Sequence, residues 1–339
     1  MNVLLSQMSG LTKIHLQNFR SYEKRSFSFG EKTVIVGENG SGKSNLMEAV
    51  YMLATGKSFR ADREDEMLKY GEGFFRVIGQ IRQMGQIGQM EITMADARKR
   101  FLINGVPRRQ IDFVGKMRAV LFCPQDMELV TGSPGGRRRY LDFVISQMDR
   151  EYRRCLISYE KGLRQRNKLL EMIREGLAQR SQLFFWDKLL IKNGEYITLK
   201  RGEYLEGLAE YDKSVISEAR LKQYEVEEVA AAATLVGPHR DDFVVNIDGR
   251  DVSKYGSRGE QRMAVLGLKE KEIEYLFFDS AQDSQQPLLL LDDILSELDH
   301  KHRDEVQKMV KDYPGQVIMT TVDDLLPPGV GELDVIRLV

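Results

Sequence analysis

The residues with the clearest chemistry form a glycine-rich stretch near the start of the chain, Gly37-Glu38-Asn39-Gly40-Ser41-Gly42-Lys43-Ser44. Their spacing fits the phosphate-binding pattern G-x-x-x-x-G-K-[ST], in which a curled backbone turns its N–H groups toward phosphates. We expect Lys43 to reach the terminal phosphates and the Ser44 hydroxyl to ligate Mg²⁺. The alternative is a glycine-rich turn that binds nothing.

The residues on both sides of this loop have the patterns that would position it. Residues 33–36 (Thr-Val-Ile-Val) predict a buried strand before the loop. Leu46, Val50 and Leu53 place an apolar stripe on a helix that follows, and Gly56 is placed to end it. The N-terminus of such a helix adds partial positive charge beside the phosphates.

A pair of carboxylates, Asp292 and Asp293, follows four leucines late in the chain. At the carboxyl end of a buried strand, Asp292 can hold Mg²⁺ through water, and Asp293 can polarise an attacking water. Many core strands end in Asp, so this run alone is weak evidence. The long stretch between Ser44 and the pair favours a nucleotide-binding core that is split by an insertion.

A second candidate anion site lies at the start of a predicted helix, at Ser257-Arg258-Gly259. It offers a hydroxyl, exposed backbone N–H groups and a helix N-terminus. One triphosphate does not need two such sites on one chain. We therefore expect Ser257 and Gly259 of one subunit to contact the γ-phosphate held by another, in a symmetric head-to-tail dimer. The alternative is a helix that is simply N-capped.

The remaining patterns predict an α/β protein with a helical insert. Alternating apolar residues predict paired strands between residues 12 and 29, and an antiparallel sheet at 75–81, 90–94 and 101–103, with turns at Gly85, Gly88 and Asn104-Gly105. Further strands are predicted at 119–122, 243–247, 287–291 and 316–321, and helices fill 137–233. Residues 1–9 are expected to be a loose extension. The predicted domains are 10–130, 131–234 and 235–339.

The composition excludes several classes of protein. The 339 residues carry a net charge of −1, so any contact with nucleic acid must come from local basic patches. Cys123 and Cys155 lack metal-ligand or redox spacing, and no apolar run approaches the roughly 20 residues that span a bilayer. We predict a cytoplasmic protein with no membrane association.

Two basic segments are candidates for contact with a phosphate backbone. One runs from Lys57 through Arg60 to Arg63, directly after the predicted loop helix. The other, residues 137–166, has nine basic and four acidic residues and includes Arg153 and Arg154. We predict that these five residues bind DNA without reading its sequence. The alternative for both segments is a solvated charged surface.

Six motifs in order give the chain a resemblance to the RecF family of bacterial recombination-mediator ATPases, relatives of the structural-maintenance-of-chromosomes (SMC) heads. The resemblance extends from about residue 12 to residue 323. Its motifs are Asn18-Phe19-Arg20-Ser21-Tyr22, the phosphate loop, Thr55-Gly56-Lys57-Ser58-Phe59-Arg60, Gly132-Ser133-Pro134 with Arg137-Arg138-Arg139, Gly237-Pro238-His239-Arg240-Asp241-Asp242, and Leu290-Leu291-Asp292-Asp293 with Ser296-Glu297-Leu298-Asp299.

The resemblance implies an ABC-type P-loop ATPase head, with a mixed sheet and an antiparallel sheet, and an inserted helical second lobe. It implies a weak, DNA-dependent ATPase that dimerises on ATP, binds single-stranded and double-stranded DNA at gaps, and helps RecO and RecR to load RecA. It places Arg20 at the nucleotide and gives Gln125 the role of a lobe-linking glutamine near the water. An arginine placed like Arg60 couples DNA to hydrolysis in related heads.

The chain departs from the wider superfamily at three positions. Glu260 stands where the signature S-x-G-Q has its glutamine, Asp293 replaces the general-base glutamate, and Thr320-Thr321-Val322-Asp323 replaces the switch histidine. The alternative hypothesis is the ATPase subunit of a membrane transporter. In such a subunit the signature motif would lie much closer in sequence to the phosphate loop. A head whose client is a protein is the third reading.

Overall fold

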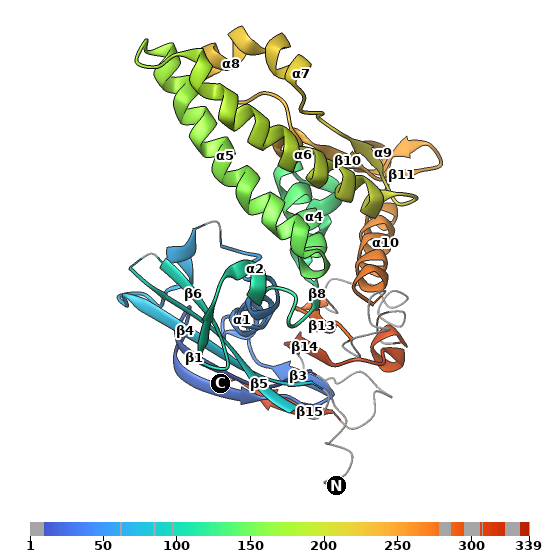
Figure 1. Ribbon diagram of the computed structural model, residues 1–339. Coiled ribbons are helices and arrows are strands. Elements are labelled where there is room, and N and C mark those ends of the chain that lie inside the picture. Colours follow the sequence, from blue (N-terminus) through green and yellow to red (C-terminus); the bar gives the residue numbers. More distant parts are fainter. Residues whose placement is uncertain are drawn as a thin grey trace. The chain divides into compact units, whose positions relative to one another are not determined.

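The computed structural model describes residues 10–61, 63–83, 86–96, 98–277, 286–294, 306, 308–322 and 333–338 (Figure 1). Contacts within the chain divide it into two compact units. Unit 1 consists of Met1–Gln125 with Glu272–Val339, and unit 2 is Asp126–Lys271, inserted between the two segments of unit 1. The predicted extension at residues 1–9 and the motif at 296–299 lie outside the described residues.

Unit 1 contains a five-stranded parallel sheet. Four of its strands are mostly apolar and buried, as expected for a sheet that is covered on both faces, whereas the edge strand at Asp334–Arg337 is charged at both ends and more exposed. The predicted strands at 33–36, 119–122, 287–291 and 316–321 are confirmed. The strand order is β15 (Asp334–Arg337), β3 (Lys32–Val36), β14 (Val317–Thr321), β13 (Leu288–Leu291), β8 (Ala119–Phe122).

Unit 1 also contains the antiparallel sheet that the sequence predicts. Residues 104 and 105 make the expected turn, with positive φ angles of 51° and 76°. The predicted turn at Gly88 is wrong, because Gly88 pairs with Ile81 inside a strand. The strand order is β2 (Tyr22–Ser28), β1 (Gly10–Phe19), β4 (Phe74–Gln83), β5 (Gln86–Ala95), β6 (Arg98–Ile103), β7 (Val106–Arg108).

Helix α1 (Lys43–Thr55) begins at the phosphate loop and contacts strands of both sheets of unit 1 (Figure 1). Gly79 of β4 permits this close packing, because a Cβ there would lie 2.6 Å from Leu53 Cδ1. Gly56 has φ 72° and donates its N–H to Met52 O, which confirms that it ends the helix. Unit 1 also contains the short helices η2 (Glu64–Met67) and α2 (Gln110–Phe113).

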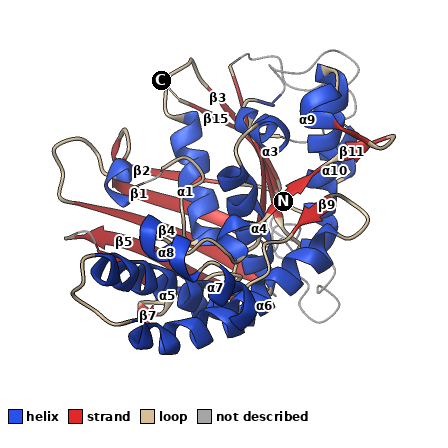
Figure 2. Ribbon diagram, turned by 90° about the horizontal axis from the view of Figure 1, so that it is seen from above, coloured by secondary structure: helices blue, strands red, loops and turns tan. Residues whose placement is uncertain are grey.

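Unit 2 confirms the predicted helical insert. Helices α5 (Arg150–Arg174) and α6 (Phe184–Leu205) lie side by side (Figure 2), and Gly162 allows their close approach, since a Cβ there would lie 2.6 Å from Leu189 Cδ2. The other helices are η3 (Pro124–Met127), α3 (Glu128–Thr131), α4 (Pro134–Met148), η4 (Arg180–Leu183), α7 (Glu218–Gln223), α8 (Glu225–Ala231), η5 (Pro238–Arg240), α9 (Val252–Tyr255) and α10 (Arg258–Phe277).

Unit 2 ends later in the chain than the predicted boundary at residue 234. Strand β10 (Asp242–Val244) pairs with β9 (Glu210–Asp212), and β11 (Asn246–Ile247) pairs with β12 (Arg250–Asp251). The first pairing and an ion pair from Arg137 to Asp242 tie the stretch after residue 234 to the helices. Ser257 and Gly259 therefore belong to unit 2. Among the described residues, no helix is long and apolar enough to cross a membrane.

Candidate active site

The phosphate loop lies between β3 and α1 and depends on its glycines. Gly40 and Gly42 have φ angles of 87° and 101°, in the left-handed region that favours glycine. A Cβ on Gly42 would lie 2.8 Å from Tyr22 Oη, so this glycine also permits a close contact. The Ser41 hydroxyl oxygen is buried and has no hydrogen-bond partner among the described residues. A phosphate oxygen would satisfy such a group.

Lys43 is almost fully buried, and its ammonium group bonds to the loop itself. Nζ donates to the carbonyl oxygens of Gly37 and Glu38, at 2.6 and 3.0 Å. A buried ammonium is best compensated by an anion, and carbonyl oxygens supply only partial charge. Lys43 and Ser41 therefore fit the phosphates of a nucleotide.

Ser44 and Asp292, the two predicted Mg²⁺ ligands, come together at the carboxyl edge of the parallel sheet. Ser44 Oγ donates to Asp292 Oδ1 at 3.2 Å, and Thr320 Oγ1 donates to the same oxygen at 2.9 Å. Burial raises the pKa of Asp292, while hydrogen bonds and the charge of Arg60 act in the opposite direction. A hydroxyl and a carboxylate are the oxygen ligands that Mg²⁺ prefers.

Thr320 also belongs to this site, although the sequence did not predict it. Besides bonding to Asp292, its Oγ1 accepts the backbone N–H of Asp293 at 2.8 Å. The signal was present, because Thr320 is the penultimate residue of β14, the strand that neighbours β13. Asp293 has a left-handed φ of 52°, which turns the chain just after Asp292. One threonine therefore fixes the carboxylate of Asp292 and the backbone of Asp293.

Gln125, predicted to act near the attacking water, is exposed and follows β8. Strand β8 pairs with β13, and the N–H of Asp292 donates to Phe122 O at 2.8 Å. The backbone leading to Gln125 therefore leaves the same edge of the sheet as Asp292. The role of the Gln125 side chain stays a prediction.

Arg20, predicted to contact the nucleotide, is bound to protein groups here. Its Nε and Nη2 donate to the carboxylate of Glu48 at 2.9 and 2.7 Å, and its Nη1 donates to Glu66 O at 2.6 Å. Glu48 is fully buried in α1. The guanidinium thus compensates a buried carboxylate, and its contact with a nucleotide stays a prediction.

The basic segment after α1 has two kinds of arginine. Arg60 Nη1 donates to Asn45 Oδ1 at 3.3 Å, which places it beside the first turn of α1. Arg63 is exposed and pairs with Asp65 at 2.6 Å, and the side chain of Lys57 is exposed as well. All three side chains are exposed, but Arg60 alone of the three contacts the first turn of α1, beside the phosphate loop.

Ser257 precedes α10 and forms a reciprocal cap with Glu260. The Ser257 N–H donates to Glu260 Oε2 at 2.7 Å, and the Glu260 N–H donates to Ser257 Oγ at 3.3 Å. The backbone hydrogen bond from Ser257 lowers the pKa of Glu260. Glu260 thus occupies the groups that the predicted γ-phosphate contact requires. The geometry is that of the capped helix, and the predicted anion site would require Glu260 to release the Ser257 N–H.

The predicted DNA contacts on α5 also have intramolecular partners. Arg153 Nη1 donates to Ser146 O, and Arg154 pairs with Glu151 at 2.5 Å. Other basic side chains are exposed along one face of the same helix, at the spacing of successive turns. They are Lys161, Arg164 and Lys168.

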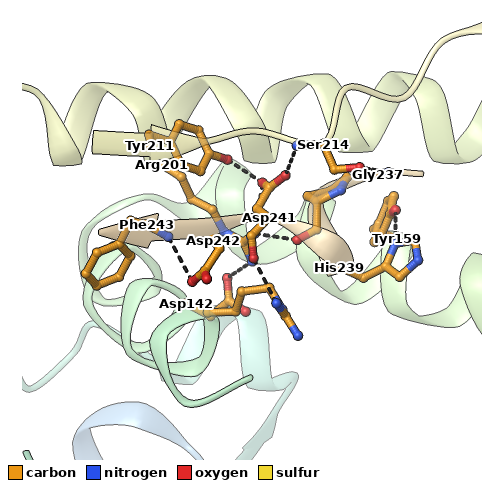
Figure 3. Close-up of polar contacts among 12 residues, drawn as sticks. Asp142, Tyr159, Arg201, Tyr211, Ser214, Gly237, His239, Asp241, Asp242 and Phe243 are labelled. Atoms are coloured by element: carbon orange, nitrogen blue, oxygen red, sulfur yellow. Dashed lines mark hydrogen bonds and ion pairs between the residues drawn. The ribbon is translucent and has the colours of Figure 1, made fainter. Parts of the chain in front are cut away.

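The motif at residues 237–242 forms part of the interior of unit 2 (Figure 3). Asp241 is fully buried, and its carboxylate accepts hydrogen bonds from Arg201 Nη1, from Tyr211 Oη and from the N–H of Ser214. Gly237 has φ 126°, and a Cβ there would meet Tyr159 Oη at 2.3 Å. This motif therefore holds the helices of unit 2 together.

The motif at residues 132–139 joins the same network. Arg137 donates from Nε and Nη2 to the carboxylate of Asp242, at 2.6 and 2.8 Å, and from Nη1 to Gly132 O at 2.8 Å. Arg138 Nη1 donates to Asp241 O at 2.8 Å. Two motifs that are about 100 positions apart in the sequence are thus one structural unit.

Comparisons with known proteins agree with this geometry. A family model described as "RecF/RecN/SMC N terminal domain" matches residues 10–326. The DNA replication and repair protein RecF of Shouchella clausii (strain KSM-K16) is 33% identical over 343 residues, which cover 91% of each chain. The protein of the same name from Bacillus cytotoxicus is 32% identical over 348 residues, 93% of this chain and 92% of that one.

Solved structures give the same answer. A structure of the recombination mediator protein RecF with ATP, in the RecFOR pathway, has a TM-score of 0.85 and 31% identity, covering 94% of this chain and 93% of that chain. An SMC head bound to the C-winged helix domain of ScpA has a TM-score of 0.50 at 17% identity, covering 93% and 90%. The second likeness concerns the fold alone, which is that of an ABC-type ATPase head.

Proposed function

Because the chain belongs to the RecF family, within the RecF/RecN/SMC N-terminal-domain family, we propose that it is an ATP-dependent DNA-binding protein of recombinational repair and replication maintenance. The observation that carries the proposal is the distance of 3.2 Å from Ser44 Oγ to Asp292 Oδ1 at the edge of the sheet. This contact lies beside a loop whose Ser41 hydroxyl has no hydrogen-bond partner in the part of the chain that the structure describes. The relatives named for replication and repair, and the similarity to RecF with ATP, support it.

The residues of the site can be given roles in ATP hydrolysis. When bound, Mg²⁺ neutralises charge on the β- and γ-phosphates. Ser44 and Asp292 would hold it, and Lys43 would exchange the carbonyls of Gly37 and Glu38 for phosphate oxygens. Asp293 would orient the attacking water and accept its proton. Its short side chain suits the slow turnover of a switch.

The switch itself requires two copies of the chain. Ser257 and Gly259 of one copy would bind the γ-phosphate held by the loop of the other, so that ATP is enclosed between them. ADP lacks that phosphate and would leave the copies apart. Hydrolysis by Asp293 would then reset the dimer to monomers.

DNA would be held through its phosphates. The predicted contacts are Lys57, Arg60, Arg63, Arg153 and Arg154, and the exposed face of α5 adds further cations in unit 2. These would bind single-stranded and double-stranded DNA, including gaps, without reading bases. The proposed partners are RecR, RecO and RecA, and the proposed location is the cytoplasm.

ATP hydrolysis measured with and without gapped DNA tests the proposal. We expect slow hydrolysis that gapped DNA accelerates, and that loses this acceleration as salt rises. A rate of ATP hydrolysis that gapped DNA does not change at low salt would contradict the proposal. It would favour a transporter subunit or an ATPase head whose client is a protein. Absence of ATP binding would contradict all three.

A further inference from the structure

A buried carboxylate on α1 connects the phosphate loop to the basic segment that follows the helix. Glu48 lies one turn after Ser44 and is fully buried. Its carboxylate accepts two hydrogen bonds from Arg20, at 2.9 and 2.7 Å, and one from Ser58 Oγ at 2.5 Å. Three hydrogen bonds, two of them from one bidentate guanidinium, thus compensate the charge.

Ser58 passes this constraint to the residues after it. The same Oγ that donates to Glu48 accepts the backbone N–H groups of Arg60 and Ala61, at 2.9 and 2.8 Å. A serine that accepts from residues two and three positions later closes a tight turn. The backbone of Arg60 is therefore fixed relative to α1.

The side chain of Arg60 then returns to the helix. Its Nη1 lies 3.3 Å from Asn45 Oδ1, and Asn45 Nδ2 donates to Ser21 Oγ at 3.0 Å. Ser21 follows Arg20 in the chain, so the contacts close on themselves. We call this closed set the α1 ring; its members are Arg20, Ser21, Asn45, Glu48, Ser58 and Arg60.

The α1 ring lies against the predicted Mg²⁺ site. Asn45 follows Ser44 in sequence, and the charge of Arg60 is close enough to Asp292 to favour the ionised carboxylate. A flexible arginine on a loop would spend little time in any one position, because ordering a long side chain costs conformational entropy. Bonds that order the backbone of Arg60 in advance reduce that cost.

We infer that Glu48 is a positioning residue for the ATPase reaction: through Ser58 it fixes Arg60 beside Asn45, which directly follows the predicted Mg²⁺ ligand Ser44. The inference rests on the proposed ATP hydrolysis. It assigns to the α1 ring the role of holding Arg60 in place for the reaction, in addition to stabilising the fold. If Ser58 acts through Arg60, its removal matters only while Arg60 is present. If the ring is only a clamp, the two residues affect hydrolysis independently.

A double-mutant cycle separates these readings. Ser58→Ala, Arg60→Ala and the double variant are compared for kcat and KM of ATP hydrolysis in the full chain. Ser58→Ala keeps both bonds between Arg20 and Glu48. We expect Ser58→Ala and Arg60→Ala each to lower kcat about tenfold, and the double variant to be no slower than Arg60→Ala. Ser58→Thr, which keeps the hydroxyl, should restore most of kcat.

Independent effects, in which the losses of the two single variants multiply, would overturn the inference. So would a Ser58→Ala protein that loses thermal stability but keeps its kcat. Glu48→Gln offers a second arm, because the amide keeps the shape and removes the charge; its loss of kcat should also vanish in the Arg60→Ala background. If the unaltered protein does not hydrolyse ATP at all, the proposed function fails instead.

Discussion

Ser44 Oγ lies 3.2 Å from Asp292 Oδ1, although 248 positions separate the two residues. The parallel sheet explains the proximity, because β3 and β13 flank β14 and all three strands end at one edge. The loop that follows β3 and the carboxylates that follow β13 are therefore neighbours. An insertion as large as unit 2 leaves that edge intact as long as the strands pair.

Lys43→Met tests the role of the phosphate loop. The substitution keeps an unbranched side chain of similar length and removes the ammonium group that we expect to face the β- and γ-phosphates. We expect the affinity for ATP to fall at least tenfold in equilibrium dialysis. Unchanged affinity would contradict the assignment of the loop. Lys24→Met, an exposed position on β2, is the matched control.

Glu260→Gln tests how the helix cap affects the second anion site. Because the carboxylate occupies the Ser257 N–H and repels phosphate, the amide should strengthen ATP-dependent dimerisation several-fold. The dissociation constant of the dimer is measured in an Asp293→Asn background, which blocks hydrolysis. Glu270→Gln is the control, since it makes the same charge change on an exposed position of α10. Weaker dimerisation of Glu260→Gln would contradict this view.

Unit 2 should lose stability in mild acid through His239. Burial lowers the pKa of His239 from 6.5 to about 4. Between these values the unfolded chain binds more protons than the folded chain, so the contribution is full above pH 6.5 and is lost as the pH falls toward 4. The loss is about 3 kcal/mol in total.

Both ring nitrogens of neutral His239 already form hydrogen bonds, so protonation of the ring would break one of them. Nε2 lies 2.9 Å from Thr234 O and must donate, so Nδ1 accepts from Tyr159 Oη at 2.8 Å. Urea unfolding at several pH values, followed by fluorescence of Trp186 in unit 2, gives the slope. His239→Gln should flatten it. An equally steep slope in His239→Gln would rule out this residue.

The exposed part of the basic segment tests the DNA contact without disturbing Arg60. Lys57→Glu combined with Arg63→Glu should weaken binding of gapped DNA and make its salt dependence shallower by about one unit of log–log slope per lost phosphate contact. The control is Lys13→Glu with Lys24→Glu, which changes the net charge equally at exposed positions of the antiparallel sheet. Equal losses in both variants would indicate a general charge effect.

Much of the fold could be predicted because its signals are local. Alternating and continuous apolar runs predicted most strands of both sheets, but not β7 or β15, and Gly56 predicted the end of α1. Gly88 misled the reading, because a glycine can also lie inside a strand; the N–H of its neighbour Gln89 bonds to Asn104 Oδ1 at 2.7 Å, at the next turn. The sequence placed the end of the helical domain at residue 234, but unit 2 continues to Lys271. Part of that extension is the pairing of β10 with β9, which no local pattern reveals.

The candidate site divides in the same way. The phosphate loop and the acidic pair are recognised from local sequence motifs, so Lys43, Ser44 and Asp292 could be named as candidates from the sequence. Thr320 could not, because its role follows from the order of strands β14 and β13. The ion pair between Arg20 and Glu48 could not be predicted either. The two residues are 28 positions apart and meet only because the turn between β1 and β2 packs on α1.

The central claim is that ATP, enclosed between two copies of the chain, acts as a switch. Sedimentation velocity of the Asp293→Asn protein with Mg²⁺ and either ATP or ADP tests it most directly. We expect a dimer with ATP, a monomer with ADP, and a monomer with ATP once Ser257→Arg is added. A monomer in both nucleotides, at protein concentrations where ATP is bound, would contradict it.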